Sequence, residues 1–312
     1  MRVEVINPDF YSEAARLVIA LLTCCHALSD GPHGTGRVSF AAMSKINLDS
    51  YFARIGYAGQ SEPSVAVLRM LCALHPIAIP FENLDVIRGS GVRLDLSSVE
   101  QKLVGDRRGG YCFEQNGLFA AALEGLGFRV TPLAARVRWQ VPAEVQMPLS
   151  HMVLRVDLED VPWLADVGFG GLTPTAPLRL DVTDPQPTPH ETFRIARSGG
   201  GYMLQAQLAN EWNDVYRFTL EPQHPIDYEV ANWFTSRHPT SRFVQNLIVA
   251  RAGYDRERVS LMNRELVIRR ESETEKRAVD TPEELLRVLA DQFGLHFPSG
   301  TRFGAPGGVS PA

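Results

Sequence analysis

The sequence predicts an α+β protein in which helices come first and strands follow. Up to about residue 128, apolar side chains recur at helical spacing. Beyond that point, short segments rich in Val, Leu and aromatic residues are separated by Gly, Pro or Asp. A last helical pattern, TPEELLRVLADQFGL, follows at 281–295. These observations indicate a helical N-terminal region, a curled antiparallel sheet or barrel, and a mixed C-terminal region.

The N-terminal region contains a series of helical patterns. Asn47 is expected to cap the first helix, whose apolar positions recur as far as Ile55 and which ends at Gly56. The others are SVAVLRMLCALH at 64–75, which is expected to stop before Pro76, a segment that begins near Ser97, and NGLFAAALEGLGF at 116–128. The first third of the chain is therefore predicted to be a helical bundle.

The strand-like segments carry β-branched and aromatic residues between turn formers, as antiparallel strands do. Those of the central region are 129–141, 151–160, 161–170, 176–182, 191–208 and 212–220. Two further segments, LIVARAG at 247–253 and RELVIRR at 264–270, precede the final helix, which Thr281 is expected to cap.

Composition excludes several classes of protein. The 312 residues are 45% hydrophobic and 21% charged, which is enough for one compound globular unit or two to three small domains. Lys plus Arg total 31 against 36 acidic residues, a net charge of −5, so the chain has no overall basic field for nucleic acid or an anionic membrane. The four cysteines, Cys24, Cys25, Cys72 and Cys112, show neither zinc-site spacing nor the density of a disulfide scaffold. A reducing, cytoplasmic location is expected.

Residues 1–42 are expected to be an N-terminal extension, either genuine or the result of an upstream start codon. Their apolar run at 17–28 is too short to span a bilayer. Glu4, Asp9 and Glu13 stand where a signal peptide would be positively charged. A chain that starts at Met43 is therefore expected to be as active as the full chain. The alternative is that the apolar run packs on the helical bundle.

One cysteine stands in an unusual setting, RRGGYCFEQN at 107–116. The two glycines allow a tight lead into a helix that is expected to begin about Phe113, and a helix N-terminus favours a thiolate at Cys112. His151 opens one predicted strand and Asp166 ends the next, so adjacent antiparallel strands would bring the two side chains together. These three residues are a candidate Cys/His/Asp triad.

Each candidate also has an ordinary interpretation. Cys112 would then be a small buried hydrophobe, His151 a hydrogen-bonded structural residue and Asp166 a turn former. The other cysteines lie in apolar helical runs, where a core position is favoured.

The motifs together resemble the arylamine N-acetyltransferase family, in its bacterial form. They are IPFENLD at 79–85, RGGYCFEQN at 108–116, HMVLRV at 151–156, WLADVGFGG at 163–171 and NWFTSRHPTSRFVQN at 232–246. They occur in the family's order, and the resemblance extends over about residues 46–297.

The resemblance implies a papain-like cysteine-triad core in three parts. They are a helical bundle with the cysteine at 43–128, a β-barrel with the histidine and aspartate at 129–230, and a linker helix with an α/β lid at 231–298, before a flexible tail at 299–312. The family's triad falls on Cys112, His151 and Asp166.

The implied reaction is acetyl-CoA-dependent N-acetylation of arylamines, arylhydroxylamines and hydrazines. It is a ping-pong reaction through an acetyl-cysteine thioester, with acetyl-CoA as co-substrate and with no permanently bound cofactor or metal. An oligomer is compatible with the sequence, and neither the physiological acceptor nor the preferred acyl chain follows from it.

The resemblance also implies secondary roles for other residues. Phe81 and Phe243 would line an aryl pocket, with plain core aromatics as the alternative. Trp139 and the turn that comprises Phe169, Gly170 and Gly171 would lie near the acyl and pantetheine channel. Glu82 and Arg108 would form a structural ion pair that braces the cysteine loop.

Two other classes of protein remain alternatives. A transglutaminase-like or papain-like hydrolase also uses Cys, His and an acid, but it would transfer the acyl group to water. Thioester turnover with and without an added arylamine would distinguish it from a transferase. In a binding module that retains an inactive triad, iodoacetamide would fail to label Cys112 at neutral pH.

Overall fold

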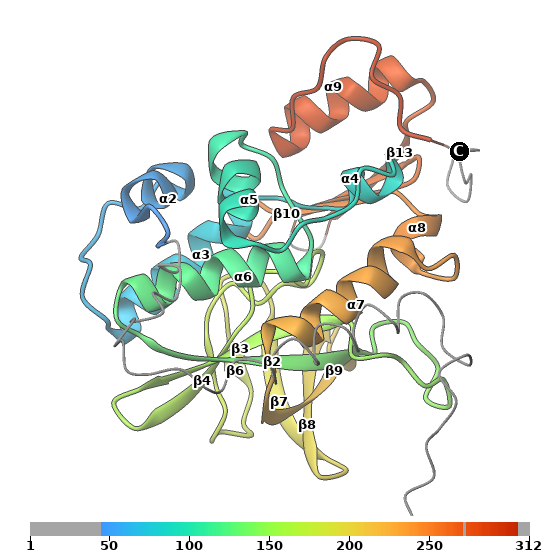
Figure 1. The fold of residues 1–312 in the computed structure, drawn as a ribbon. Coiled ribbons are helices and arrows are strands. Elements are labelled where there is room, and N and C mark those ends of the chain that lie inside the picture. Colours follow the sequence, from blue (N-terminus) through green and yellow to red (C-terminus); the bar gives the residue numbers. More distant parts are fainter. Residues whose placement is uncertain (1–44, 271–272, 305–312) are drawn as a thin grey trace, which may run out of the picture. The chain divides into compact units, whose positions relative to one another are not determined.

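The computed structural model describes residues 45–270 and 273–304 (Figure 1). The predictions for residues 1–42 and for the last part of the tail, 305–312, lie outside the described residues. The predicted α+β class is confirmed, because the described chain combines helices with two antiparallel sheets. Within it, no helix has both the length and the apolar character that crossing a bilayer requires.

The N-terminal helices begin largely where the sequence predicts. Asn47 caps α2 (Leu48–Ile55) by accepting a hydrogen bond from the Ser50 N–H at 3.0 Å. The helix α3 (Val65–Ala78) does not stop before Pro76 but continues through it. Pro76 lacks the N–H that would bond to the Cys72 carbonyl, but the helix has only two more residues after it. The prediction that the helix stops before Pro76 was therefore wrong. The remaining elements are α4 (Leu84–Ile87), α5 (Leu96–Glu100), the π-helical turn η2 (Gln101–Gly105) and α6 (Cys112–Gly125).

The larger sheet has eight strands in the order β5-β4-β3-β2-β9-β8-β7-β6. The strands are β2 (Arg129–Val137), β3 (His151–Leu158), β4 (Val161–Ala165), β5 (Leu178–Arg179), β6 (Gln186–Pro187), β7 (Thr192–Ser198), β8 (Gly201–Leu208) and β9 (Glu211–Pro222). The Gln186 side chain joins the two edge strands, because it accepts from the Arg179 N–H at 2.8 Å and donates to the Arg179 carbonyl at 3.0 Å. The sheet is therefore a nearly closed antiparallel barrel.

The smaller sheet has five strands in the order β1-β10-β11-β12-β13. Its first strand, β1 (Phe81–Glu82), comes from the N-terminal region, and the others are β10 (Ile248–Ala252), β11 (Arg258–Met262), β12 (Glu265–Arg270) and β13 (Glu273–Ala278). The C-terminal helices are α7 (Pro225–Arg237), α8 (Arg242–Gln245) and α9 (Pro282–Phe293), which Thr281 caps as predicted. The domain boundary predicted at residue 230 falls inside α7.

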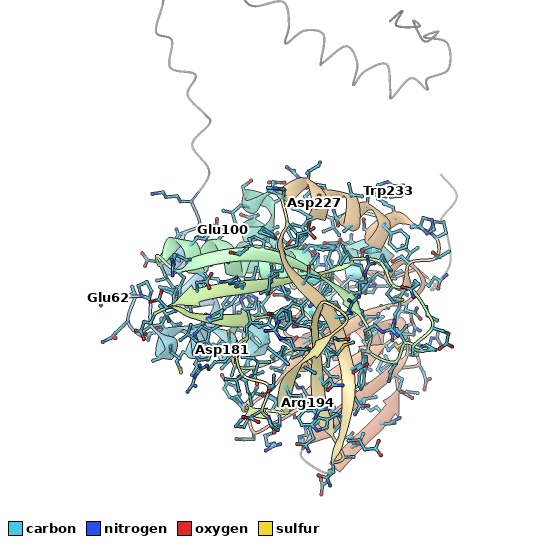
Figure 2. The ribbon with its side chains drawn as sticks, turned by 90° about the horizontal axis from the view of Figure 1, so that it is seen from below. Glu62, Glu100, Asp181, Arg194, Asp227 and Trp233 are labelled. Atoms are coloured by element: carbon cyan, nitrogen blue, oxygen red, sulfur yellow. The ribbon has the colours of Figure 1, made fainter. Side chains whose placement is uncertain are left out.

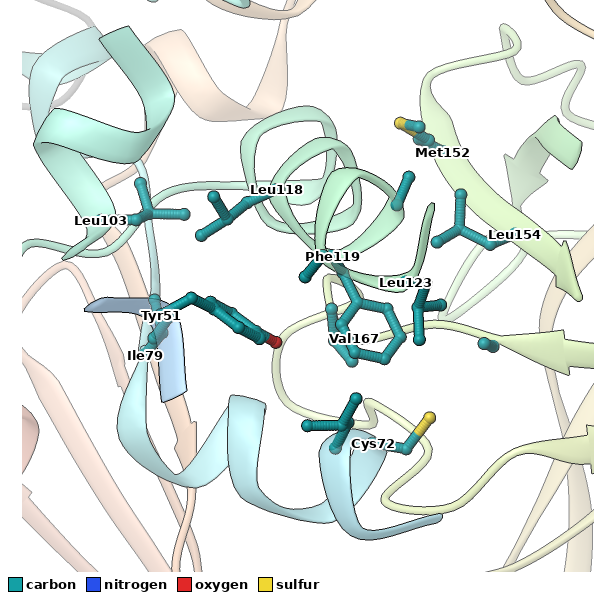
Figure 3. Packing of buried hydrophobic residues seen from close by; sticks show 14 of the residues in the cluster. Tyr51, Cys72, Ile79, Leu103, Leu118, Phe119, Leu123, Met152, Leu154 and Val167 are labelled. Atoms are coloured by element: carbon teal, nitrogen blue, oxygen red, sulfur yellow. The ribbon is translucent and has the colours of Figure 1, made fainter. Parts of the chain in front are cut away.

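Three apolar clusters hold these elements together. In the first, α6 lies across β2 and β3 (Figure 1), and Phe119 and Leu123 of α6 lie close to Leu154 of β3 (Figure 3). The second fills the barrel, and the third lies between α9 and the smaller sheet. Charged side chains such as Asp181 lie at the outer surface (Figure 2). The helix α6 is thus packed against β3.

Candidate active site

Cys112 is the first residue of α6 and is 3% exposed. The glycines before it are required by close approach, because a Cβ on Gly109 would lie 2.1 Å from the Pro80 carbonyl oxygen. The Cys112 thiol donates to the Ser150 carbonyl at 3.5 Å. Cys112 therefore lies at a helix N-terminus and directly beside the residue that precedes His151.

His151 and Asp166 are brought together by adjacent strands, as predicted. β3 begins at His151, and β4 pairs with it antiparallel through Leu154 and Ala165. The His151 Nε2 and the Asp166 Oδ2 are 2.8 Å apart, and both side chains are buried. Because Asp166 accepts from Nε2, Nδ1 is the ring nitrogen left for Cys112, which also interacts with the imidazole.

The charges of this pair reinforce each other. Burial alone would lower the pKa of His151, but the charge and hydrogen bond of Asp166, with a smaller contribution from Cys112, raise it well above its usual value. Burial would raise the pKa of Asp166, but His151 and two hydrogen-bond donors, Asn116 and the Gly168 N–H, lower it. The pair is therefore an imidazolium and a carboxylate at neutral pH.

Asn116 is a residue at the site that the sequence reasoning missed. Its Nδ2 donates to Asp166 Oδ1 at 2.9 Å and to the Met152 carbonyl at 2.8 Å. Its Oδ1 accepts from the Val167 N–H at 3.0 Å. Asn116 lies one helical turn after Cys112, so this spacing was the available signal. One helix thus carries the thiol and also holds the acid.

Aromatic rings fix the plane of the imidazole. Phe169 was predicted to lie near the acyl and pantetheine channel. Its ring meets the His151 ring edge-on, with the two centroids 5.2 Å apart. Tyr216, which the sequence reasoning did not single out, lies on β9 with its ring centroid 5.0 Å from that of His151. Burial and the nearby Asp166 raise the pKa of Tyr216, so its hydroxyl is neutral at physiological pH.

Cys112 and His151 open onto a cavity of about 400 Å³. Four of the predicted substrate contacts line it: Phe81, Trp139, Phe169 and Phe243. The other residues of its wall are Val137, Val141, Met147, Pro148, Ser150, Gly168, Phe234, Thr235, Thr240, Ser241, Arg242 and Ile248. The cavity is thus mostly apolar and aromatic, and its polar lining residues include Cys112, His151 and Arg242.

The glycines of the turn after β4 have different positions from those expected. Gly168 lines the cavity, whereas Gly170 and Gly171 are not among the described lining residues. A Cβ on Gly168 would lie 2.9 Å from the Cys112 Cα, so glycine allows the turn to approach the cysteine. Gly170, with φ +90°, lies behind the Phe81 ring, and Gly171 is exposed.

The predicted pair of Glu82 and Arg108 is present, with Arg108 Nη2 2.6 Å from Glu82 Oε1. It belongs to a larger cluster, because Asp85 also contacts Arg108 and Lys102. Lys102 in turn contacts Glu114, whose Oε2 accepts from the Tyr111 N–H at 3.0 Å. The cluster braces the loop before Cys112 on the side away from the cavity.

A thiol beside an imidazole and a carboxylate can act as a covalent nucleophile without a metal. In the described ranges, no group of three or more His, Cys, Asp and Glu side chains is arranged to hold a metal ion.

The fold agrees with comparisons to known proteins. A sequence model described as N-acetyltransferase matches residues 64–301, which gives the class of protein. The chain is 41% identical over 256 residues to an arylamine N-acetyltransferase of Mycobacterium tuberculosis H37Rv, which covers 80% of this chain and 90% of that protein. It is 40% identical over 250 residues to the arylamine N-acetyltransferase / N-hydroxyarylamine O-acetyltransferase of Salmonella typhimurium, covering 80% and 88%.

Solved structures give the same result. The arylamine N-acetyltransferase of Mycobacterium marinum has a TM-score of 0.77 and 43% identity, with 80% of this chain and 92% of that chain covered. The structure of the M. marinum enzyme in complex with CoA has a TM-score of 0.77 and 42% identity, with the same coverage. The chain belongs to the arylamine N-acetyltransferase family.

Proposed function

We propose that this protein transfers an acetyl group from acetyl-CoA to arylamines, arylhydroxylamines and hydrazines through an acetyl thioester on Cys112. The observation that carries the proposal is the position of Cys112, at a helix N-terminus, beside the His151 and Asp166 pair and on the wall of an aromatic cavity.

In the first half-reaction, Cys112 reacts as the thiolate that is paired with the His151 imidazolium, and this thiolate attacks the acetyl carbon. The helix N-terminus and the imidazolium both favour the thiolate. The tetrahedral oxyanion accepts from the Cys112 N–H, because the first N–H groups of a helix have no partner within the helix. The bond between the acetyl carbon and the CoA sulfur then breaks, and CoA leaves with the proton from His151.

In the second half-reaction, the acceptor nitrogen attacks the thioester carbonyl. The nitrogen loses its proton to His151 Nδ1, the C–S bond to Cys112 breaks, and the thiolate is restored. Asp166 keeps the proton on Nε2 throughout, so that Nδ1 serves as the base, and it balances the imidazolium charge. A thioester suits this sequence because it stays activated while one substrate replaces the other.

Substrate positions follow from the cavity. We assign the acceptor ring to the part of the cavity lined by Phe81 and Phe243, whose rings pack against each other with their centroids 5.9 Å apart. The acetyl and pantetheine groups pass Trp139, Gly168 and Phe169, which line the cavity, and residues 231–298 cover the site as a lid. Two relatives support the classes of substrate: the M. marinum enzyme has a structure in complex with CoA, and the name of the Salmonella enzyme includes N-hydroxyarylamine O-acetyltransferase. The free thiols of Cys72 and Cys112 accord with a cytoplasmic setting.

Steady-state kinetics with acetyl-CoA and a panel of arylamines and hydrazines test the proposal. A ping-pong transferase gives parallel double-reciprocal lines when both substrates are varied. Intersecting lines would contradict the thioester intermediate. Loss of acetyl-CoA that is equally fast without any acceptor would identify a hydrolase instead.

A further inference from the structure

Asn83 is a buried side chain that the proposed chemistry does not use. It lies between β1 and α4 and is 2% exposed. Asparagine at a helix start usually accepts a hydrogen bond from the first turn. In the described chain, however, the Asn83 side chain caps no N–H of α4, and the Leu84 N–H donates to Glu82 Oε2 at 2.6 Å instead. The Asn83 amide is therefore available for contacts elsewhere.

In the described residues, all hydrogen bonds of the Asn83 side chain go to one distant segment, residues 243–248. The Asn83 Nδ2 donates to the Phe243 carbonyl and to the Asn246 carbonyl, each at 2.7 Å. Its Oδ1 accepts from the Ile248 N–H at 2.8 Å. Both donors of the amide are thus used, and the backbone is held at each end of this segment.

The segment that Asn83 holds carries one wall of the cavity. Phe243 and Ile248 both line the cavity, and Phe243 faces Phe81. Phe81 lies two residues before Asn83, so a single stretch of chain supplies one ring of this aromatic wall and holds the backbone that carries the other ring.

We infer that Asn83 is a positioning residue that sets how the Phe243 ring packs on Phe81, and thereby sets the shape of the aromatic wall that selects the acceptor ring. The inference rests on the proposed function, because it takes the cavity as the acceptor site. A change of one methylene in an apolar pocket alters selectivity by about 10-fold to 200-fold. Loss of the Asn83 hydrogen bonds to residues 243–248 is therefore expected to change the relative kcat/KM values of different acceptors more than the rate of acetyl transfer to Cys112.

Asn83→Asp tests this inference with little change in volume. The variant keeps an acceptor for the Ile248 N–H but loses both donors and turns a carboxylate toward two carbonyls. We expect CoA release on mixing with acetyl-CoA, without acceptor, to match the wild type. We expect kcat/KM for an aryl hydrazide to fall about tenfold relative to that for an alkyl hydrazide without a ring.

Asn263→Asp is the matched control. Asn263 donates to Asn246 Oδ1 and accepts from the Leu247 N–H, each at 3.0 Å, so it holds the same segment without a hydrogen bond to Phe243. For this variant, the ratio of kcat/KM for the aryl hydrazide to kcat/KM for the alkyl hydrazide should equal the wild-type ratio. In a Phe243→Ala background, Asn83→Asp should have no further effect on the ratio, because the wall that it positions is absent.

A ratio unchanged by Asn83→Asp, or an equal loss with both hydrazides, would overturn the inference. If Asn83→Asp does not fold, Asn83→Ala removes the same bonds without adding charge, and its ratio is interpreted in the same way. A wild type that releases no CoA without acceptor would contradict the thioester proposal alone, because the ratio of acceptors still tests Asn83.

Discussion

The helix α3 and the start of α6 each bring a buried cysteine near a buried histidine, with different results. On α3, Cys72 and His75 lie three residues apart inside the apolar core, and Figure 3 shows Cys72 in this packing. Burial raises the pKa of the Cys72 thiol well above its usual value. At α6, Cys112 faces a cavity and the imidazole of His151. The two buried thiols therefore differ in that Cys112 lines a cavity, whereas Cys72 is enclosed in the apolar core.

The two histidines differ in their partners. The His75 Nδ1 contacts the Tyr51 hydroxyl at 2.8 Å and its Nε2 contacts Gln115 Oε1 at 2.7 Å. With these neutral partners, burial lowers the pKa of His75 to about 4. His151 has a carboxylate partner instead, and its pKa is raised. A single buried acid therefore decides whether a buried imidazole is charged.

The largest expected effect comes from exchanging the thiols. Cys112→Ser should abolish acetyl transfer and leave the fold intact, because a serine hydroxyl does not ionise beside a histidine and several kcal/mol of barrier lowering are lost. Cys72→Ala should keep wild-type turnover. Equal activity of both variants in a CoA-release assay would remove the distinction between the two cysteines.

Removing the acid should make His151 resemble His75. Asp166→Asn has similar volume but should lower kcat on the order of a thousandfold, because the tautomer is no longer held and the imidazolium is no longer balanced. The variant should also unfold at a lower temperature, since Asp166 Oδ1 accepts from Asn116 and from the Gly168 N–H. A folded variant with a near-normal rate would exclude Asp166 from the mechanism.

Asn116→Ala should have a smaller effect. A hydrogen bond to a charged group contributes about 1.5–3 kcal/mol, so kcat should fall roughly 10-fold to 100-fold as Asp166 loosens. The variant Asn213→Ala, at a half-buried position of β9 where the amide donates to the Glu211 carbonyl, should keep the wild-type rate. A loss of melting temperature with normal kcat would mean that Asn116 only braces the fold.

The histidines should give opposite pH dependences of stability. The folded pKa of His75, about 4, is below its unfolded value of 6.5, so the unfolded state binds the extra proton and stability falls as pH drops from 6.5 to 4. The raised pKa of His151 contributes stability below pH 6.5, which is lost as pH rises through the folded value.

Urea unfolding of His75→Gln checks the acid side of this comparison. The wild type should lose roughly 3 kcal/mol more unfolding free energy than the variant between pH 6.5 and 4. Parallel pH profiles for the two proteins would show that His75 is not buried in its neutral form.

The sequence predicted the features that depend on local pattern. Gly109 and Gly110 marked the turn into α6, and the positions of His151 and Asp166 at strand ends predicted their pairing. The Pro225 that begins α7 was an available signal, since proline is common at a first helical position and Asp227 accepts from the His224 N–H at 2.8 Å. The strand β13, ETEKRA, is exposed at every position, so it had no alternation to detect.

Long-range contacts escaped the sequence reasoning. Asn116 bonds to residues about 36 to 51 positions away and Asn83 to residues 160 to 165 positions away, and no local pattern encodes such partners. Gly168 could not be distinguished from Gly170 and Gly171, because only the folded turn decides which glycine approaches Cys112.

The most direct test of the thioester account is peptide mass spectrometry of the protein after brief reaction with acetyl-CoA alone. We predict one acetyl group on the peptide that contains Cys112, none on the peptide that contains Cys72, and loss of that acetyl group when an arylamine is added. Acetyl transfer to the arylamine without any acetylated Cys112 peptide, or with an acetyl group that persists in its presence, would contradict the account.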